Sequence, residues 1–208
     1  KAYGDAIMVI AVGPHHNTYP VRYAELKAST FAAPLRAEAL ARSGDFTAAQ
    51  SAIDATARDC YHCVRVRGVI DALQRKWGSA AARFGFAAEQ APSLPFAYLD
   101  WGQMLMAKRD LDGAIAKFTL ANRKGPHFAD PLEMWGEALI AKNRSDLALA
   151  KFEETDRYAP NWRRLHLKWG EALWWSGKHD EAKKQFAIAS GFDLTAAEKT
   201  ELARVMHG

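Results

Sequence analysis

The same short phrase occurs three times in the chain at a constant interval. It reads Trp101-Gly102-Gln103-Met104-Leu105, then Trp135-Gly136-Glu137-Ala138-Leu139, then Trp169-Gly170-Glu171-Ala172-Leu173, and each copy begins 34 residues after the one before. A period of this length is typical of repeat architectures, in which each unit packs only on its neighbours. The repeat therefore decides the fold class before any single helix is assigned.

Further positions extend the repeat to five units. A small residue is followed twelve residues later by alanine, and four residues after that by a large apolar residue. The three columns are Ala37, Gly68, Gly102, Gly136 and Gly170; Ala49, Ala80, Ala114, Ala148 and Ala182; and Ile53, Phe84, Phe118, Phe152 and Phe186. Small residues facing large ones at fixed offsets let two helices pack closely. Each unit contains helix-breaking residues near its middle, and the middle three units end at Pro92, Pro126 and Pro160. This pattern predicts two helices per unit.

These columns resemble the tetratricopeptide (TPR) family, whose unit is a 34-residue pair of antiparallel helices. The match runs from about Thr30 to Leu194. It implies an all-α fold, a right-handed superhelical solenoid of five helix pairs over residues 30–194. The first two units depart most from the pattern, since Tyr61 stands where proline is usual and Asp71 stands where other units have Leu.

Both ends of the repeat region carry their own signals. Thr195-Ala196-Ala197-Glu198 has the form of a capping box, which predicts a capping helix over residues 195–208 that runs to about Met206. We expect this helix to cover the apolar face of the last pair, with Trp175 as its packing partner. Residues 1–29 form an N-terminal segment that resembles the remnant of a preceding repeat.

The seven tryptophans divide by position. Trp101, Trp135 and Trp169 share one column of the first helices, and an aromatic stripe at helical spacing is usually core. Trp174 lies in a different column, which is expected to face a groove. It is therefore the tryptophan that we connect with function.

The TPR resemblance implies a non-enzymatic protein-protein interaction module, which binds a peptide or partner segment in the concave groove of the first helices. The groove columns of the family fall on Leu99, Gln103, Met106, Glu133, Glu137, Ile140, Leu167, Glu171 and Trp174. Met106, Ile140 and Trp174 would be apolar anchors beside an acidic patch, so the expected partner carries basic and apolar side chains. The Lys and Asn pair of chaperone-binding TPR domains does not appear here, so that activity is not inferred.

The two cysteines, Cys60 and Cys63, form a C-x-x-C motif at an expected helix start. A helix N-terminus lowers the pKa of a thiol, so a redox protein using this pair is an alternative function. A possible disulfide or two free thiols are the other readings. No strand pattern surrounds the motif, and a thioredoxin-like site would need one. The C-x-x-C-H sequence of covalent haem attachment is absent.

Other chemistries receive little support. His15 and His16 are adjacent, and His62 is a third histidine that could bind a metal. Zinc would need further ligands that the sequence does not supply. Neither a metal nor another cofactor is therefore predicted. No nucleotide-binding or hydrolase motif occurs. The net charge of +4 is mild and the groove is acidic, which opposes a nucleic-acid partner. The longest apolar run, Ala6 to Val12, is too short to span a membrane.

One further alternative concerns the context of the repeats. Residue 1 is Lys, which indicates a trimmed chain, so the repeats could be the regulatory or oligomerising arm of a longer enzyme. The oligomeric state and the identity of the partner are left open. The cytoplasm is only slightly preferred as the location.

Overall fold

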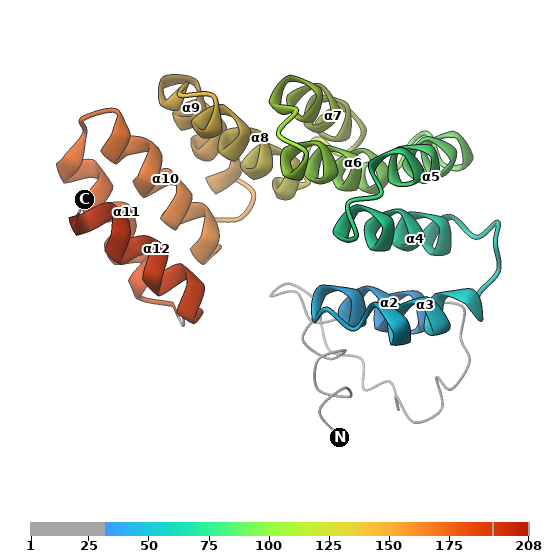
Figure 1. Cartoon of the computed structure of the whole chain (residues 1–208). Helices are drawn as coiled ribbons and strands as arrows, with labels where there is room; N and C mark the ends of the chain where they lie inside the picture. Colours follow the sequence, from blue (N-terminus) through green and yellow to red (C-terminus); the bar gives the residue numbers. More distant parts are fainter. Residues whose placement is uncertain (1–31, 193, 208) are drawn as a thin grey trace. The chain divides into compact units, whose positions relative to one another are not determined.

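The computed structural model describes residues 32–192 and 194–207, and within these ranges it contains eleven helices and no strand (Figure 1). First and second helices of each pair alternate along the chain. They are α2 (Ala32–Arg42) and α3 (Phe46–Asp54), α4 (Tyr61–Leu73) and α5 (Trp77–Gln90), α6 (Phe96–Ala107) and α7 (Leu111–Lys124), α8 (Ala129–Ala141) and α9 (Ser145–Asp156), α10 (Arg163–Trp175) and α11 (His179–Ser190), and then α12 (Ala196–His207). The all-α prediction is confirmed.

The small and large columns of the sequence meet inside each pair. A Cβ atom added at Gly136 would lie 2.5 Å from Cε1 of Phe152, and the other three Gly–Phe pairs of the repeat are as close. Phe152 itself is fully buried. In the first pair the small residue is Ala37, which carries a methyl group, and the facing residue is the smaller Ile53. Volume is thus conserved along the column, as close packing requires.

The turn between the two helices has the same backbone form in all five pairs. One residue in each turn adopts a positive φ, and these residues are Gly44, Arg75, Arg109, Asn143 and Gly177. Glycine adopts the left-handed backbone conformation readily, whereas other residues are destabilised in it by about 1–2 kcal/mol. The helix-breaking residues in the sequence therefore mark turns with the same positive φ, although only two of the five turns have glycine at that position.

Replacing Arg109 by Gly is expected to raise the free energy of unfolding by roughly 0.5–1 kcal/mol. The substitution removes the steric cost of φ 70° at an exposed position, and the greater freedom of glycine in the unfolded chain offsets part of the gain. Urea denaturation of the two proteins measures the difference. Gly177→Ala is the reciprocal control and is expected to lower stability, because Gly177 has φ 78°.

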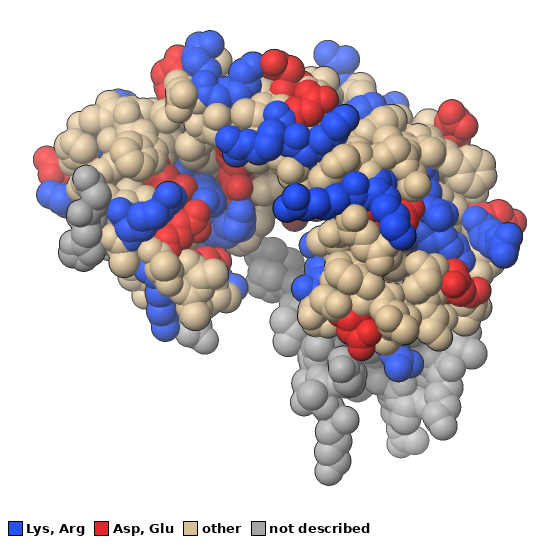
Figure 2. Space-filling model, viewed as in Figure 1, with Lys and Arg blue, Asp and Glu red and all other residues tan. Residues whose placement is uncertain are grey.

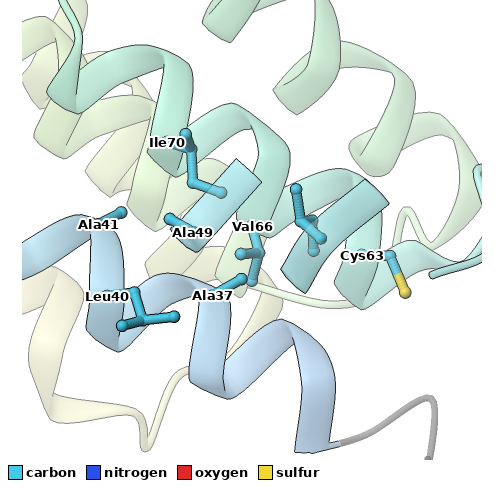
Figure 3. Close-up of a cluster of buried hydrophobic side chains, with 8 residues drawn as sticks. Ala37, Leu40, Ala41, Ala49, Cys63, Val66 and Ile70 are labelled. Atoms are coloured by element: carbon cyan, nitrogen blue, oxygen red, sulfur yellow. The ribbon is translucent and has the colours of Figure 1, made fainter. Parts of the chain in front are cut away.

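The chain divides into two compact units, residues 1–92 and 93–208. In the first unit, α2 packs on α3 and on α4, and α4 packs on α5. A cluster of buried side chains joins α2, α3 and α4, and Figure 3 shows it. Its members are Ala37, Leu40, Ala41, Ala49, Ile53, Cys63, Val66 and Ile70.

In the second unit, each first helix packs on its own second helix and on the next first helix. One apolar cluster of this unit is built around Phe152 and another around Phe186. Trp135 and Trp169 are half-buried and pack against the first cluster, as their column predicts. No helix in the described part of the chain is long and apolar enough to cross a membrane.

The capping helix forms as the sequence predicts. The Oγ1 atom of Thr195 accepts from the Glu198 N–H, and the Glu198 carboxylate accepts from the Thr195 N–H at 2.8 Å, which completes a capping box. Helix α12 packs on α10, and its Val205 joins the cluster of Leu167 and Phe186. The expected role of Trp175 as packing partner is wrong, because the residue is 60% exposed. The predicted N-terminal segment, residues 1–29, lies outside the described residues.

Candidate partner-binding surface

The first helices of the second unit lie side by side, since α6 packs on α8, α8 on α10, and α10 on α12. Residues spaced by three and four along these helices share one face. We call this surface the first-helix face and define it by its partly exposed members, Gln103, Met106, Glu137, Ile140, Arg164 and Trp174. Five of these six residues were predicted from the sequence to line a groove, and Arg164 was not.

The other predicted groove residues are buried. Leu167 is fully enclosed in the last apolar cluster, and Leu99 is 6% exposed. The Glu133 and Glu171 residues retain 1% and 5% of their surface. A partner that docks on the first-helix face therefore does not reach these four side chains in this structure, and the sequence-based lining is corrected to that extent.

Two of the expected contact residues also have structural roles. The amide of Gln103 lies 3.6 Å from Sδ of Met134 and so links α6 to α8. The ring of Trp174 is 4.4 Å from the ring of His179 and also packs against Phe186. Trp174 is thus held in one orientation, with part of its surface in the core of the last pair.

An ion-pair network crosses the second unit from α8 through α10 to α12. Nε of Arg164 is 3.2 Å from Glu133, and the same guanidinium also pairs with Glu137. Lys168 pairs with Glu171 at 3.1 Å and with Glu201 of α12. Figure 2 shows acidic and basic side chains interleaved in this region.

The network changes the expected electrostatics of the groove. The sequence predicts an acidic patch of Glu133, Glu137 and Glu171 that would attract basic groups. In the structure, Arg164 and Lys168 already pair with these three carboxylates. The patch is therefore largely neutralised from within the molecule, and a partner's cations would have to compete with them.

Burial perturbs two of these acids. Burial raises the pKa of Glu133 well above its usual value; the nearby Glu137 adds to the rise, while Arg164 and Lys168 oppose it. The pKa of Glu171 rises to about 7, mainly through burial, with the Lys168 ammonium opposing and Glu201 contributing. Oε1 of Glu171 is buried and has no hydrogen-bond partner among the described residues. Such an environment favours the protonated acid.

The free energy of unfolding is expected to fall as the pH rises from about 4.5 to about 7. Glu171 has a usual pKa of 4.5 and a raised pKa in the folded protein, so folding takes up a proton in this window and the benefit is lost above it. The variant Glu171→Gln should make this slope shallower, while Glu133, whose pKa is also raised, retains its own contribution. Denaturant titrations between pH 4.5 and 8 measure it, and an equally steep slope in the variant would refute the assignment.

The matched control is Glu198→Gln. Burial acts to raise the pKa of Glu198, but hydrogen bonds from Thr195 and the Arg163 guanidinium hold that pKa below its usual value. The stability that Glu198 provides is present above its unfolded pKa and is lost only as the pH falls through the lowered one. Glu198 is not among the groups that shift the pKa of Glu171, so its replacement should leave the slope between pH 5 and 7 in place.

A disulfide joins Cys60 and Cys63, with Cα atoms 5.2 Å apart. Cys60 caps α4, because its sulfur accepts from the Cys63 N–H at 3.1 Å, and Cys63 is fully buried in the cluster of the first unit. Of the three sequence-based readings, the structure contains the disulfide. It lies at the start of α4, where it links the N-cap residue covalently to the first turn of the helix.

Reduction of this disulfide is expected to lower the free energy of unfolding by about 2 kcal/mol. The closed loop contains only four residues, so the entropy it removes from the unfolded chain is small. Guanidinium titration with and without dithiothreitol measures the loss. A Cys60→Ser, Cys63→Ser variant is the control and should not respond to the reductant.

The remaining sequence candidates concern metals and nucleic acids. Within residues 32–192 and 194–207, no group of three His, Cys, Asp or Glu side chains could hold a metal ion. His15 and His16 lie outside these ranges. The adjacent basic residues Arg163 and Arg164 are both paired within the molecule, Arg163 with Glu198 and Arg164 with the two α8 carboxylates.

Sequence reasoning missed the role of Arg164 and Lys168. The two basic residues are four apart on one first helix, and Glu133 and Glu137 are four apart on the preceding one. This matched spacing of opposite charges on consecutive first helices was the available signal. Interpreting this signal requires knowing which residues of consecutive first helices lie opposite one another.

Comparisons with known proteins agree with the repeat. No protein-family model matches the sequence, and no curated protein matches it significantly. Among solved structures, MamA superposes with a TM-score of 0.60 at 19% identity, over 81% of this chain and 96% of MamA. PilF of Pseudomonas aeruginosa gives 0.68 at 13% identity, over 99% of this chain and 86% of PilF.

A third structure is named for the repeat itself. TTC0263, a thermophilic TPR protein of Thermus thermophilus, gives a TM-score of 0.71 at 16% identity, over 83% of this chain and 97% of that one. At these identities the likeness concerns the fold. Together with the 34-residue columns, it shows that the chain has a TPR-like helical-repeat fold.

Proposed function

We propose that the chain is a non-enzymatic protein-protein interaction module, which binds a segment of a partner protein on the first-helix face. The observation that carries the proposal is a row of apolar side chains, Met106, Ile140 and Trp174, which occupy equivalent positions in three consecutive repeats. All three are partly exposed. Helical repeats use extended surfaces of this kind to bind partners.

The ion pairs within the molecule support a partner with more apolar and less basic character than the sequence alone suggests. Apolar anchors should supply most of the affinity, because the acids that were expected to attract cations are paired within the molecule. Glu137 keeps 13% of its side-chain surface and is the one of the three acids that a basic group of the partner could still approach. We therefore propose a partner segment rich in apolar side chains, with basic residues in a secondary role. No cofactor takes part in this function.

The test uses Met106→Glu in the full chain. Met106 is partly exposed on α6, so a carboxylate placed there should disturb docking more than folding. Partners cross-linked to the wild-type chain in its source extract are identified and then titrated against the purified variant. We expect binding to weaken at least about tenfold, since each 1.4 kcal/mol of lost contact energy is a factor of ten.

The control is Ile188→Glu, which places the same charge on a second helix. Ile188 is 43% exposed on α11 and lies outside the first-helix face. This variant should bind like the wild type, and circular dichroism should show that both variants are folded. Equal binding by the Met106→Glu variant would contradict the proposed surface.

A further inference from the structure

The second repeat lacks the tryptophan that the third, fourth and fifth repeats carry on their first helices. In the third and fourth repeats, a lysine covers the tryptophan of the first helix: Nζ of Lys117 is 3.3 Å from the ring centroid of Trp101, and Nζ of Lys151 is 4.3 Å from that of Trp135. Each lysine follows its tryptophan by 16 residues. The second repeat has Arg67 and Arg83 at these two positions. Two cations thus replace an attractive cation–π pair.

Positions next to α4 in two further columns also differ from those of later repeats. Asp71 stands where later repeats have Leu. Gln50, on the preceding second helix, corresponds to Ile115 and Leu149, which belong to the same apolar cluster as the tryptophans of the following first helices. Four positions that are apolar or form a cation–π pair around the first helices of the third and fourth repeats are therefore polar together around α4. A single chance substitution would not produce this pattern.

The consequence is a pocket in the first unit, with a volume of about 420 Å³. Helices α3, α4 and α5 and the loop after α3 supply its lining, which consists of Gln50, Asp54, Arg58, Arg67 and Arg83. Three of the five lining residues are arginines. The pocket lies in a different unit from the first-helix face and is independent of the function proposed for that face.

Arg67 forms the inner wall of the pocket and is only 8% exposed. Its guanidinium donates to the carbonyl oxygens of Ala57 at 3.0 Å, Ile53 at 2.7 Å and Thr56 at 3.0 Å. These acceptors are neutral, and no carboxylate of the described residues lies within ion-pair distance of Arg67. Its charge is therefore held in place without being neutralised.

The other charges leave the pocket positive. Nε of Arg83 donates to Asp71 at 2.6 Å, and Asp54 accepts from Gln50 at 2.7 Å. Arg58 is exposed at the pocket. Three arginines against Asp54 and Asp71 give a net charge of +1. The pKa of Arg67 is lowered, first by burial and then by Arg83, with a smaller contribution from Arg58, while Asp54 opposes the shift.

We propose that this pocket binds a small ligand that carries an oxyanion, a phosphate or a carboxylate group. The planar guanidinium donors of Arg58 and Arg83 would bind the anion, because arginine pairs with both groups through paired N–H donors. Arg67 supplies a fixed positive wall. The volume exceeds that of the anion alone, so there is room for the small molecule or side chain that carries it.

The test titrates the full chain with inorganic phosphate, and separately with acetate, at constant ionic strength. Isothermal calorimetry and backbone amide NMR shifts measure affinity and location. Saturable binding that perturbs amides of α3, α4 and α5 supports the proposal. Binding of phosphate alone assigns a phosphate ligand, and binding of both assigns a general oxyanion site.

Three variants make the result specific. Arg58→Gln removes an exposed donor that no described contact ties to the core, and the Arg58→Gln, Arg83→Gln double variant should weaken binding at least about tenfold. Lys117→Gln, which alters the matching column of the third repeat, should leave the affinity unchanged. No saturable binding of either anion by the wild type, or equal binding by the folded double variant, would overturn the proposal.

Discussion

Replacing Arg164 by Met should lower the free energy of unfolding by about 3 kcal/mol at pH 8. Arg164 pairs with Glu133, which retains 1% of its side-chain surface, so its loss leaves a carboxylate buried without its cation. Breaking a buried pair costs about 3–5 kcal/mol, and the lower end applies because Arg164 keeps 37% of its own side-chain surface. Chemical denaturation measures the loss.

The pH dependence distinguishes this cause from a simple loss of packing. The pKa of Glu133 is already raised by burial, and without Arg164 it should rise further, so the carboxyl becomes protonated at pH 5 and the defect shrinks there. Arg163→Met is the control: its side chain is 41% exposed, its partner is Glu198, and its loss should cost at most about 1 kcal/mol. A defect of equal size at pH 5 and pH 8 would show that charge is not the cause.

Replacing Gly136 by Ala should also lower the free energy of unfolding by about 3 kcal/mol. The new methyl group would lie 2.5 Å from Cε1 and 2.7 Å from Cζ of Phe152, and because that ring is fully buried, relief of the clash requires the ring or its helix to shift. Overpacking a core usually costs about 1–3 kcal/mol, and contacts this short place the change at the upper end. Thermal and urea denaturation both report it.

The first repeat supplies the rescue experiment. There Ala37 faces Ile53, so the combination of a methyl group with a smaller partner is already used in this chain. Gly136→Ala combined with Phe152→Ile should therefore be more stable than the sum of the two single changes implies. Simple additivity of the two losses would mean that the residues do not compete for the same volume. Gly78→Ala is the control, since no atom lies within 4 Å of a Cβ there.

The sequence predicts the fold well because the evidence is local and repeated. Ala114 and Phe118 are fully buried, as their columns require, and the same columns are buried in the other repeats. The capping helix follows from a four-residue motif that completes its own hydrogen bonds. Each of these inferences needs residues from one helix pair only, so a fixed period is enough to make it.

The candidate surface was predicted less well because it depends on contacts between repeats. Glu133 was expected to face a partner, but its burial and its pairing with Arg164 depend on how α10 lies against α8. Trp175 was expected to meet the capping helix, but α12 contacts α10 through the cluster of Leu167 and Val205 instead. Periodicity gives the face of a helix to within one residue. Adjacent residues such as Trp174 and Trp175 can be told apart only when the rotation of the helix about its own axis is known more accurately.

The ion pairs that connect α8, α10 and α12 should determine how this part of the molecule unfolds locally. Arg164 and Lys168 lie one turn apart on α10 and connect it to helices on both sides. In a repeat protein, the terminal elements would ordinarily fray first and independently. Here the detachment of α12 would leave Glu201 unpaired, remove one of the two carboxylates that pair with Lys168, and uncover Leu167. Amide hydrogen exchange in α8, α10 and α12 should therefore proceed through shared openings, so that the last third of the chain behaves as one cooperative block.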